Sequence, residues 1–112
     1  MSEPAEDGDF KPLADVDPVI HAPARLSIMA MLFVVQSADF VFLQKHTGLT
    51  RGNLSSHLSK LEAAGYVTIE KKFVDRVPRT LLMLTEPGLE AFRKYREQMQ
   101  KALKDLPGEQ AR

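Results

Sequence analysis

One segment, residues 49–73, constrains the fold of this chain more than any other. It reads LTRGNLSSHLSKLEAAGYVTIEKKF, and leucines recur in it at the spacing of a single helix face: Leu54, Leu58 and Leu61. Thr50 is a suitable N-cap for this helix, and Gly65 can end it in the left-handed conformation. The residues after this glycine alternate as in a strand. The segment therefore predicts a helix over Thr50–Ala64 that leads directly into a strand over Tyr66–Phe73.

The opposite face of this predicted helix is small and polar. A rotation of 100° per residue places there Gly52, Asn53, Ser56, Ser59, Lys60 and Ala63. None of these residues is acidic, and none is a large apolar residue. Such a face suits a helix that enters a nucleic-acid groove and contacts phosphates and base edges.

The residues before this helix complete a helix-turn-helix pattern. Ser37 can cap a helix over about Ala38–His46, in which Phe40 and Leu43 would point inward. The turn would be Thr47-Gly48-Leu49, with the glycine as its pivot. Two helices joined by a short glycine turn are therefore expected here.

The residues after the strand predict a β-hairpin and then a long helix. Val74–Pro78 would be the hairpin loop, and Arg79–Leu84 would be the second strand. Thr85 can cap a final helix that runs to about Leu106, and Glu86 suits the positive end of its dipole.

The N-terminal part of the chain predicts a tail, a short ordered start and a buried helix. Met1–Pro12 is acidic, contains Pro and Gly and has little apolar surface to bury, so we expect disorder there. Asp17 is a plausible cap, and Pro18 would occupy a first helical position. Pro23–Gln36 should form a helix that is apolar on two sides, so it should be buried on two sides.

Taken together, these motifs resemble those of a known family. The pattern T-x-G-N-L-S-x-H-L-x-x-L-E-x-A-G-Y-V, followed by KKF, PRT and L-T-x-x-G, resembles the winged helix-turn-helix DNA-binding proteins. The nearest resemblance is to small single-domain bacterial and archaeal transcriptional regulators related to the MarR and ArsR families, and it extends over about Asp17–Phe92. It implies a mainly α fold with a small β-hairpin (α+β) and an added C-terminal dimerisation helix. The implied protein is a homodimer on a pseudo-palindromic double-stranded DNA site, with Thr50–Ala64 in the major groove and the hairpin as the wing.

This resemblance implies a division of the chain and a set of DNA contacts. The parts would be a disordered acidic tail (1–12), the winged helix domain (13–85), the dimerisation helix (86–106) and a tail (107–112). The recognition-helix candidates are Thr50, Arg51, Gly52, Asn53, Ser55, Ser56, His57 and Lys60. The wing candidates are Lys71, Lys72, Arg76 and Arg79.

These candidates differ in their expected roles. The best candidates for contacts to base edges or phosphates are Arg51, Asn53, Ser56 and Lys60; the alternative is an ordinary exposed helix face. Arg prefers the O6 and N7 atoms of guanine, and Asn prefers the N6 and N7 atoms of adenine. His57 is expected to pack against the neighbouring helix rather than to reach a phosphate. Gly52 either allows close approach to the DNA backbone or is a neutral first-turn residue. Thr50 and Ser55 are expected to serve mainly as a cap and a local backbone partner.

The wing candidates also have two interpretations. Arginine is attracted to the negative potential of the minor groove, which favours Arg76 and Arg79 as the DNA contacts. Adjacent strand residues point to opposite faces, so only one of Lys71 and Lys72 can face DNA directly. The alternative is that these lysines only prevent edge-to-edge aggregation of strands.

The last helix carries a coiled-coil-like seam with one charged interruption. We expect it to pair with a second subunit, so that the dimer contact comes from this helix and the helix over Pro23–Gln36; the alternative is that the last helix folds back on its own domain. The predicted dimer interface comprises Ile28, Leu32, Val35, Leu89, Phe92, Arg96, Met99, Leu103 and Leu106.

Charge and composition narrow the function. The net charge is zero, but residues 1–20 hold six acids and one base, while residues 43–83 hold seven bases and three acids. DNA binding depends on the local field at the contacted surface, so neutrality does not argue against it. No apolar run approaches the ~20 residues of a membrane span, and there is no cysteine, which favours a cytoplasmic location without disulfides.

No feature of the sequence favours an enzyme, a cofactor or a metal site. There is no nucleophile motif, no phosphate-binding glycine loop and no pair of catalytic acids. Asp15, Asp17 and His21 come closest to a metal-ligand spacing, but capping and surface roles explain them better.

The main prediction is therefore a DNA-binding repressor, with two alternatives. A winged helix can serve as a protein-interaction module, which the acidic tail and zero net charge would fit. A small-molecule effector could also bind at the dimer interface, because methionines adapt to varied ligands. The candidate lining residues are Met29, Met31, Phe42, Met83 and Met99.

Overall fold

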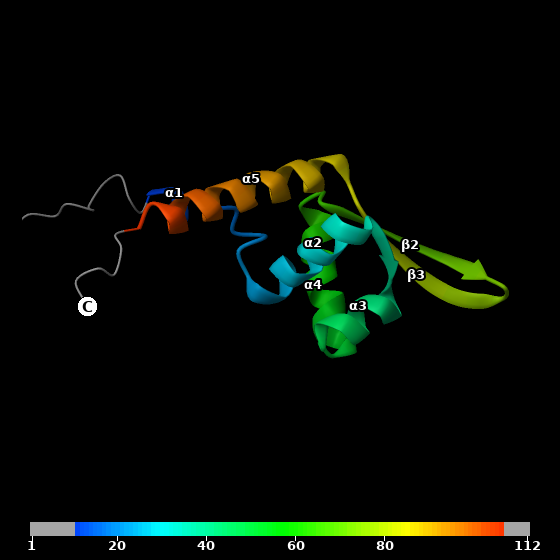
Figure 1. Cartoon of the computed structure of the whole chain (residues 1–112). Helices are drawn as coiled ribbons and strands as arrows, with labels where there is room; N and C mark the ends of the chain where they lie inside the picture. The colour runs from blue at the N-terminus through cyan, green and yellow to red at the C-terminus, as the bar shows by residue number, and fades with distance from the viewer. Residues whose placement is uncertain (1–10, 107–112) are drawn as a thin grey trace, which may run out of the picture.

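The computed structural model describes residues 11–106, with five helices and three strands in that range (Figure 1). In chain order they are α1 (Lys11–Ala14), α2 (Pro23–Val35), β1 (Ser37–Asp39), α3 (Phe40–Thr47), α4 (Arg51–Ala63), β2 (Val67–Val74), β3 (Val77–Leu84) and α5 (Glu86–Lys104). The mainly α fold with a small β-hairpin is confirmed. The hairpin of β2 and β3 projects away from the helices at one end, and α1 lies along α5 at the other.

The helix predicted over Thr50–Ala64 is confirmed as α4, together with its cap and flanking turns. The Thr50 side chain accepts a hydrogen bond from the Asn53 backbone N–H at 3.1 Å, which caps α4. Gly48 and Gly65 have φ angles of 72° and 82°, so both turns require the left-handed conformation that glycine adopts without strain. The three leucines of the predicted stripe are all buried in α4.

The strand β1 was not predicted from the sequence. Ser37–Asp39 pairs antiparallel with Leu81–Met83, so the sheet has the order β1-β3-β2. The prediction that Ser37 caps the next helix is wrong. Asp39 is the cap of α3, because its carboxylate accepts from the Phe42 N–H at 2.8 Å.

The hairpin turn is shorter than predicted. The structure pairs Val74 with Val77 and leaves only Asp75 and Arg76 in the turn, both with positive φ. A two-residue turn of this kind matches the twist of the flanking strands. Pro78 is therefore a strand residue, in the part of β3 that β1 does not reach, and a free strand edge tolerates its missing N–H.

The segment around Asp17 forms a turn rather than the helix start predicted at Pro18. The Asp17 carboxylate accepts from the Val19 N–H at 2.8 Å, which satisfies the backbone without a helix. Order begins earlier than predicted, because α1 already covers Lys11. The rest of the predicted tail, residues 1–10, lies outside the described residues, as do residues 107–112.

Tyr66 connects three parts of the chain. Its hydroxyl donates to the Asp17 carboxylate, and its carbonyl accepts from the Thr85 N–H at 3.0 Å. Burial raises the pKa of Tyr66 to about 12, and the Asp17 carboxylate adds to the shift, so the phenol remains a donor. The turn after α4 is thus hydrogen-bonded both to the N-terminal segment and to the start of α5.

One core holds the helices on the sheet. It contains apolar residues of α2, α4 and the strands together with the inner face of α5, among them Met29, Leu54, Leu82 and Phe92. At the end of α5, Ala102 is fully buried, and this part of the helix lies beside α1. Among residues 11–106 no helix is both long and apolar enough to cross a membrane.

Replacing Gly88 with alanine should destabilise the fold. A Cβ at this position would overlap the carbonyl of Tyr66, which is rigid backbone. We expect Gly88→Ala to lower the free energy of unfolding by about 1–3 kcal/mol in a urea titration.

Gly52→Ala is the matched control, because a Cβ there meets nothing within 4 Å. It should leave stability unchanged or raise it by up to about 1 kcal/mol, since alanine is the better helix former. Equal stability of the two variants would contradict the close packing at Gly88.

Candidate nucleic-acid interface

The polar face of α4 is open to solvent along its length. Its exposed residues include Arg51, Gly52, Asn53, Ser55, Ser56 and Lys60. Because the leucines on the other face are packed into the core, the helix has one fixed orientation and cannot turn this polar surface inward. Thr50 is also exposed, although its hydroxyl is already engaged as the cap of the helix.

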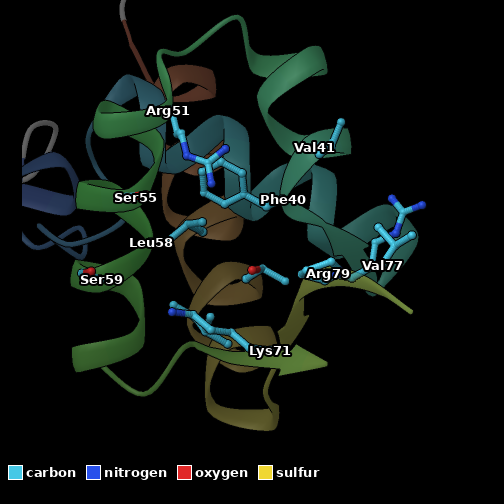
Figure 2. A pocket seen from close by; sticks show the side chains of 12 residues that line it. Phe40, Val41, Arg51, Ser55, Leu58, Ser59, Lys71, Val77 and Arg79 are labelled. Carbon is cyan, nitrogen blue, oxygen red and sulfur yellow. The ribbon is translucent and has the colours of Figure 1, made fainter. Parts of the chain in front are cut away.

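A cavity of about 560 Å³ lies between α4 and the hairpin; we name it the α4–wing groove (Figure 2). Its polar lining comes from two sides: α4 contributes Arg51, Ser55 and Ser59, and the hairpin contributes Lys71, Arg79 and Thr80. Apolar residues of α3, α4 and the strands complete it. The groove therefore offers cations and hydroxyl donors on both walls, which are the groups that bind a phosphate.

Arg51 is held against an aromatic ring at one wall of this groove. Its guanidinium carbon lies 5.4 Å from the centre of the Phe40 ring, and Figure 2 shows the two groups beside each other. A cation–π contact at this distance restricts the arginine without neutralising its charge. The side chain is thereby kept at the exposed first turn of α4.

Strand register decides which wing cations face the groove. Lys71 shares its face of the sheet with Ile69 and lines the groove, whereas Lys72 points to the other face and pairs with Glu70 at 3.5 Å. The residue favoured from the sequence, Arg79, borders the groove but pairs with Asp39 at 3.3 Å.

The cations divide into paired and unpaired groups. Within residues 11–106, Arg51, Lys71 and Arg76 have no carboxylate within 4 Å of their charged nitrogens. Unpaired cations keep their full attraction for an anion. Lys71 therefore becomes a stronger candidate than the sequence suggested, and Arg79 a weaker one.

His57 is directed towards α2 rather than towards the open face of α4. Its Nδ1 lies 3.2 Å from the Nη1 of Arg25, which can only donate, so Nδ1 must accept and carries no proton. Burial lowers the pKa of His57 below its ordinary value of 6.5, and the charges of Arg25 and Lys60 lower it further. His57 is accordingly neutral at pH 7 and supplies no positive charge to a phosphate.

The predicted dimer interface needs correction at three positions. Ile28 and Leu32 are fully buried and Phe92 nearly so, all within the core of their own chain. The alternative, that α5 folds back on its own domain, is therefore correct for its inner face. Arg96 lies over the Phe33 ring at 5.2 Å, and the remaining predicted interface residues retain exposed surface: Val35, Leu89, Met99, Leu103 and Leu106.

One exposed apolar residue of α2 lies outside the predicted interface. Val34, at the end of α2, is 77% exposed, and Leu103 on α5 is 58% exposed. Val34 belongs to a continuous apolar run, Ile28–Val35, in which no periodicity separates it from its buried neighbours. Its exposure is visible only once the helix is packed.

The structure also places the residues considered for a metal site and for an effector pocket. The Asp17 carboxylate is engaged by Val19 and Tyr66, and His21 Nδ1 lies 2.8 Å from the Tyr95 hydroxyl. Within residues 11–106 no three His, Cys, Asp or Glu side chains cluster as metal ligands would. An effector pocket at the dimer interface stays a prediction; among its five candidate lining residues, Met29 is buried in the core, and Met83 and Phe42 are exposed.

Comparison with known proteins agrees with this architecture. Residues 24–103 match the family model described as winged helix DNA-binding domain, and the chain belongs to this family. An uncharacterized protein of Methanocaldococcus jannaschii is 32% identical over 77 residues, which cover 69% of this chain and 84% of that protein.

Two solved structures are similar over most of the chain. A transcriptional regulator homologue from Pyrococcus horikoshii OT3 superposes with a TM-score of 0.79 and 33% identity, covering 88% of this chain and 98% of that one. The overoxidized AbfR bound to DNA has the same fold at 18% identity, with a TM-score of 0.64 and coverage of 91% and 70%. The resemblance to winged helix-turn-helix transcriptional regulators is thereby confirmed.

The proton affinity of His57 is a direct test of its contact with Arg25. An NMR titration should give His57 a pKa below 6.5, and Arg25→Gln should raise it, because one neighbouring charge is removed. As pH falls, His57 is protonated in the unfolded chain before it is protonated in the folded protein, because its pKa is lower in the folded state. The contribution of neutral His57 to stability is therefore complete above pH 6.5 and is lost as pH falls below it. An unchanged pKa in Arg25→Gln would contradict the contact.

Proposed function

We propose that this protein is a sequence-specific, double-stranded DNA-binding transcriptional regulator that acts as a homodimer and represses by covering a promoter. The observation that carries the proposal is the exposed polar face of α4 beside a groove lined by unpaired cations. Membership of the winged helix family supports DNA-binding regulation in general. The site of action would be the cytoplasm, with the chromosome.

In the proposed complex α4 lies in the major groove. Arg51 and Asn53 are in or next to its first turn, where recognition helices present side chains to base edges. The DNA backbone would then pass along the α4–wing groove, between Arg51 on one wall and Lys71 on the other. Bases would be read from α4, and phosphates would be held from both sides.

The proposed dimer would use the apolar surface that the single chain leaves uncovered. Val34, Val35 and Leu103 are exposed residues of α2 and α5. Pairing through these helices would leave both α4 polar faces free. Two-fold symmetry would place the half-sites about one helical turn, ~34–36 Å, apart.

The DNA proposal is tested by measuring binding to a fluorescent duplex of the protein's own upstream region. The same measurement is made with an unrelated duplex, and both are made at low and moderate salt. Arg51→Ala should weaken binding by about 1–3 kcal/mol and relax the preference at one base pair. Lys71→Ala should weaken binding to all sequences and reduce the salt slope by about one.

Lys72→Ala is the matched control, because this lysine is adjacent on β2 but faces away from the groove and pairs with Glu70. It should retain nearly full affinity. If the protein binds both duplexes weakly and without salt dependence, the protein-interaction module becomes the better assignment. If Lys71→Ala and Lys72→Ala behave alike, the proposed backbone path is wrong.

Sedimentation equilibrium tests the proposed dimer. The unsubstituted protein should have the mass of two chains, and Leu103→Asp should shift it towards one chain by placing a charge in the apolar interface. Val74→Asp, which charges an exposed apolar residue on the distant hairpin, should leave the mass unchanged. A dimer that is insensitive to Leu103→Asp would exclude this face.

A further inference from the structure

The end of the hairpin is apolar on both faces. Phe73 is 75% exposed, and Val74 and Val77 are each about half exposed. The register places Phe73 opposite Pro78 on one face and Val74 opposite Val77 on the other. In Figure 1 this end projects beyond the helices, so none of them covers it.

Exposed apolar residues at a strand end are a liability for a soluble protein, because they promote association with other chains. Their presence at a projecting tip indicates a partner that covers them. The turn of Asp75 and Arg76 adds only two residues, so the end remains a narrow two-stranded ribbon.

The charges around this tip indicate the nature of the partner. Residues 67–84 carry four cations and two acids. Lys72 pairs with Glu70 and Arg79 pairs with Asp39, which leaves two unpaired cations, Lys71 and Arg76, against one acid, Asp75. The partner should therefore be anionic and should also present apolar surface. The minor groove of DNA has both properties, with phosphates along its edges and sugar rings on its walls.

The position of Phe73 relative to Lys71 indicates where the tip would meet the DNA. Both lie on the face of β2 that includes the α4–wing groove, and two strand residues span about 7 Å. With Lys71 on a backbone phosphate, Phe73 lies one further step towards the tip. That step would carry the ring past the phosphate line and into the adjacent minor groove.

We propose that the wing tip is an apolar wedge for duplex DNA, with Phe73 packing into the minor groove and opening a base step so that the duplex bends. This inference rests on the proposed DNA-binding function. Apolar side chains that enter a base step in this way kink the duplex towards the major groove. The wedge would also favour flexible pyrimidine–purine steps where the wing falls.

The test compares affinity, salt dependence and DNA bending in Phe73→Ala and Phe73→Leu. The bend is measured as fluorescence energy transfer between the two ends of the upstream duplex at saturating protein, so that all DNA is bound. Phe73→Ala should lose affinity by about tenfold, keep the salt slope and straighten the duplex. Phe73→Leu keeps an apolar side chain and should recover most of the bend.

Lys71→Ala serves as the contrasting variant, because it should change the salt slope and retain the bend. Unchanged affinity and bend in Phe73→Ala would overturn the wedge, and so would a loss of affinity with the bend retained. Absence of salt-sensitive binding by the unsubstituted protein would overturn the proposed function as well. If Phe73→Ala instead retained DNA binding but lost binding to phosphatidylglycerol vesicles, the tip would belong to a membrane contact.

Discussion

The burial of one leucine stripe determines how the rest of this molecule is arranged. Leu54, Leu58 and Leu61 are almost completely removed from solvent, and together they fix both the position and the rotation of α4. Full burial of three such side chains contributes several kcal/mol, so a rotated helix would be strongly disfavoured. The polar face is therefore held outward by packing on the opposite side of the helix, and the Arg51 contact with the Phe40 ring leaves its charge available to a partner.

Local signals made α4 and its caps predictable, whereas long-range pairing did not. The roles of Thr50 and Thr85 as caps and the conformations of Gly48 and Gly65 depend on a few adjacent residues, and all four agree with expectation. The strand β1 depends on residues more than forty positions away, because three residues form a strand only when β3 lies beside them. Nothing in Ser37–Asp39 alone distinguishes that strand from the start of a helix.

In the candidate site, too, local signals were predictable and long-range pairing was not. The residue types on α4 followed from helical periodicity, but the roles of the wing residues required the strand register. Lys71 and Lys72 are equivalent in sequence, yet only Lys71 lines the groove. The pairing of Arg79 with Asp39 could not be foreseen, since Asp39 reaches that position only as part of β1. The assignment of the α5 seam to the dimer interface was partly wrong. Periodicity identifies an apolar face but does not show whether the same chain or another chain covers it.

The hydrogen bonds of Tyr66 have a mechanical consequence. Through its hydroxyl and its carbonyl, the turn after α4 is fastened to the N-terminal segment and to the beginning of α5, and Gly88 packs directly against the same carbonyl. These contacts restrict relative motion at the junction between α4 and the long C-terminal helix. The two helices would move as a single lever, so a displacement applied far along α5 would be carried to the polar face of α4 rather than absorbed between them.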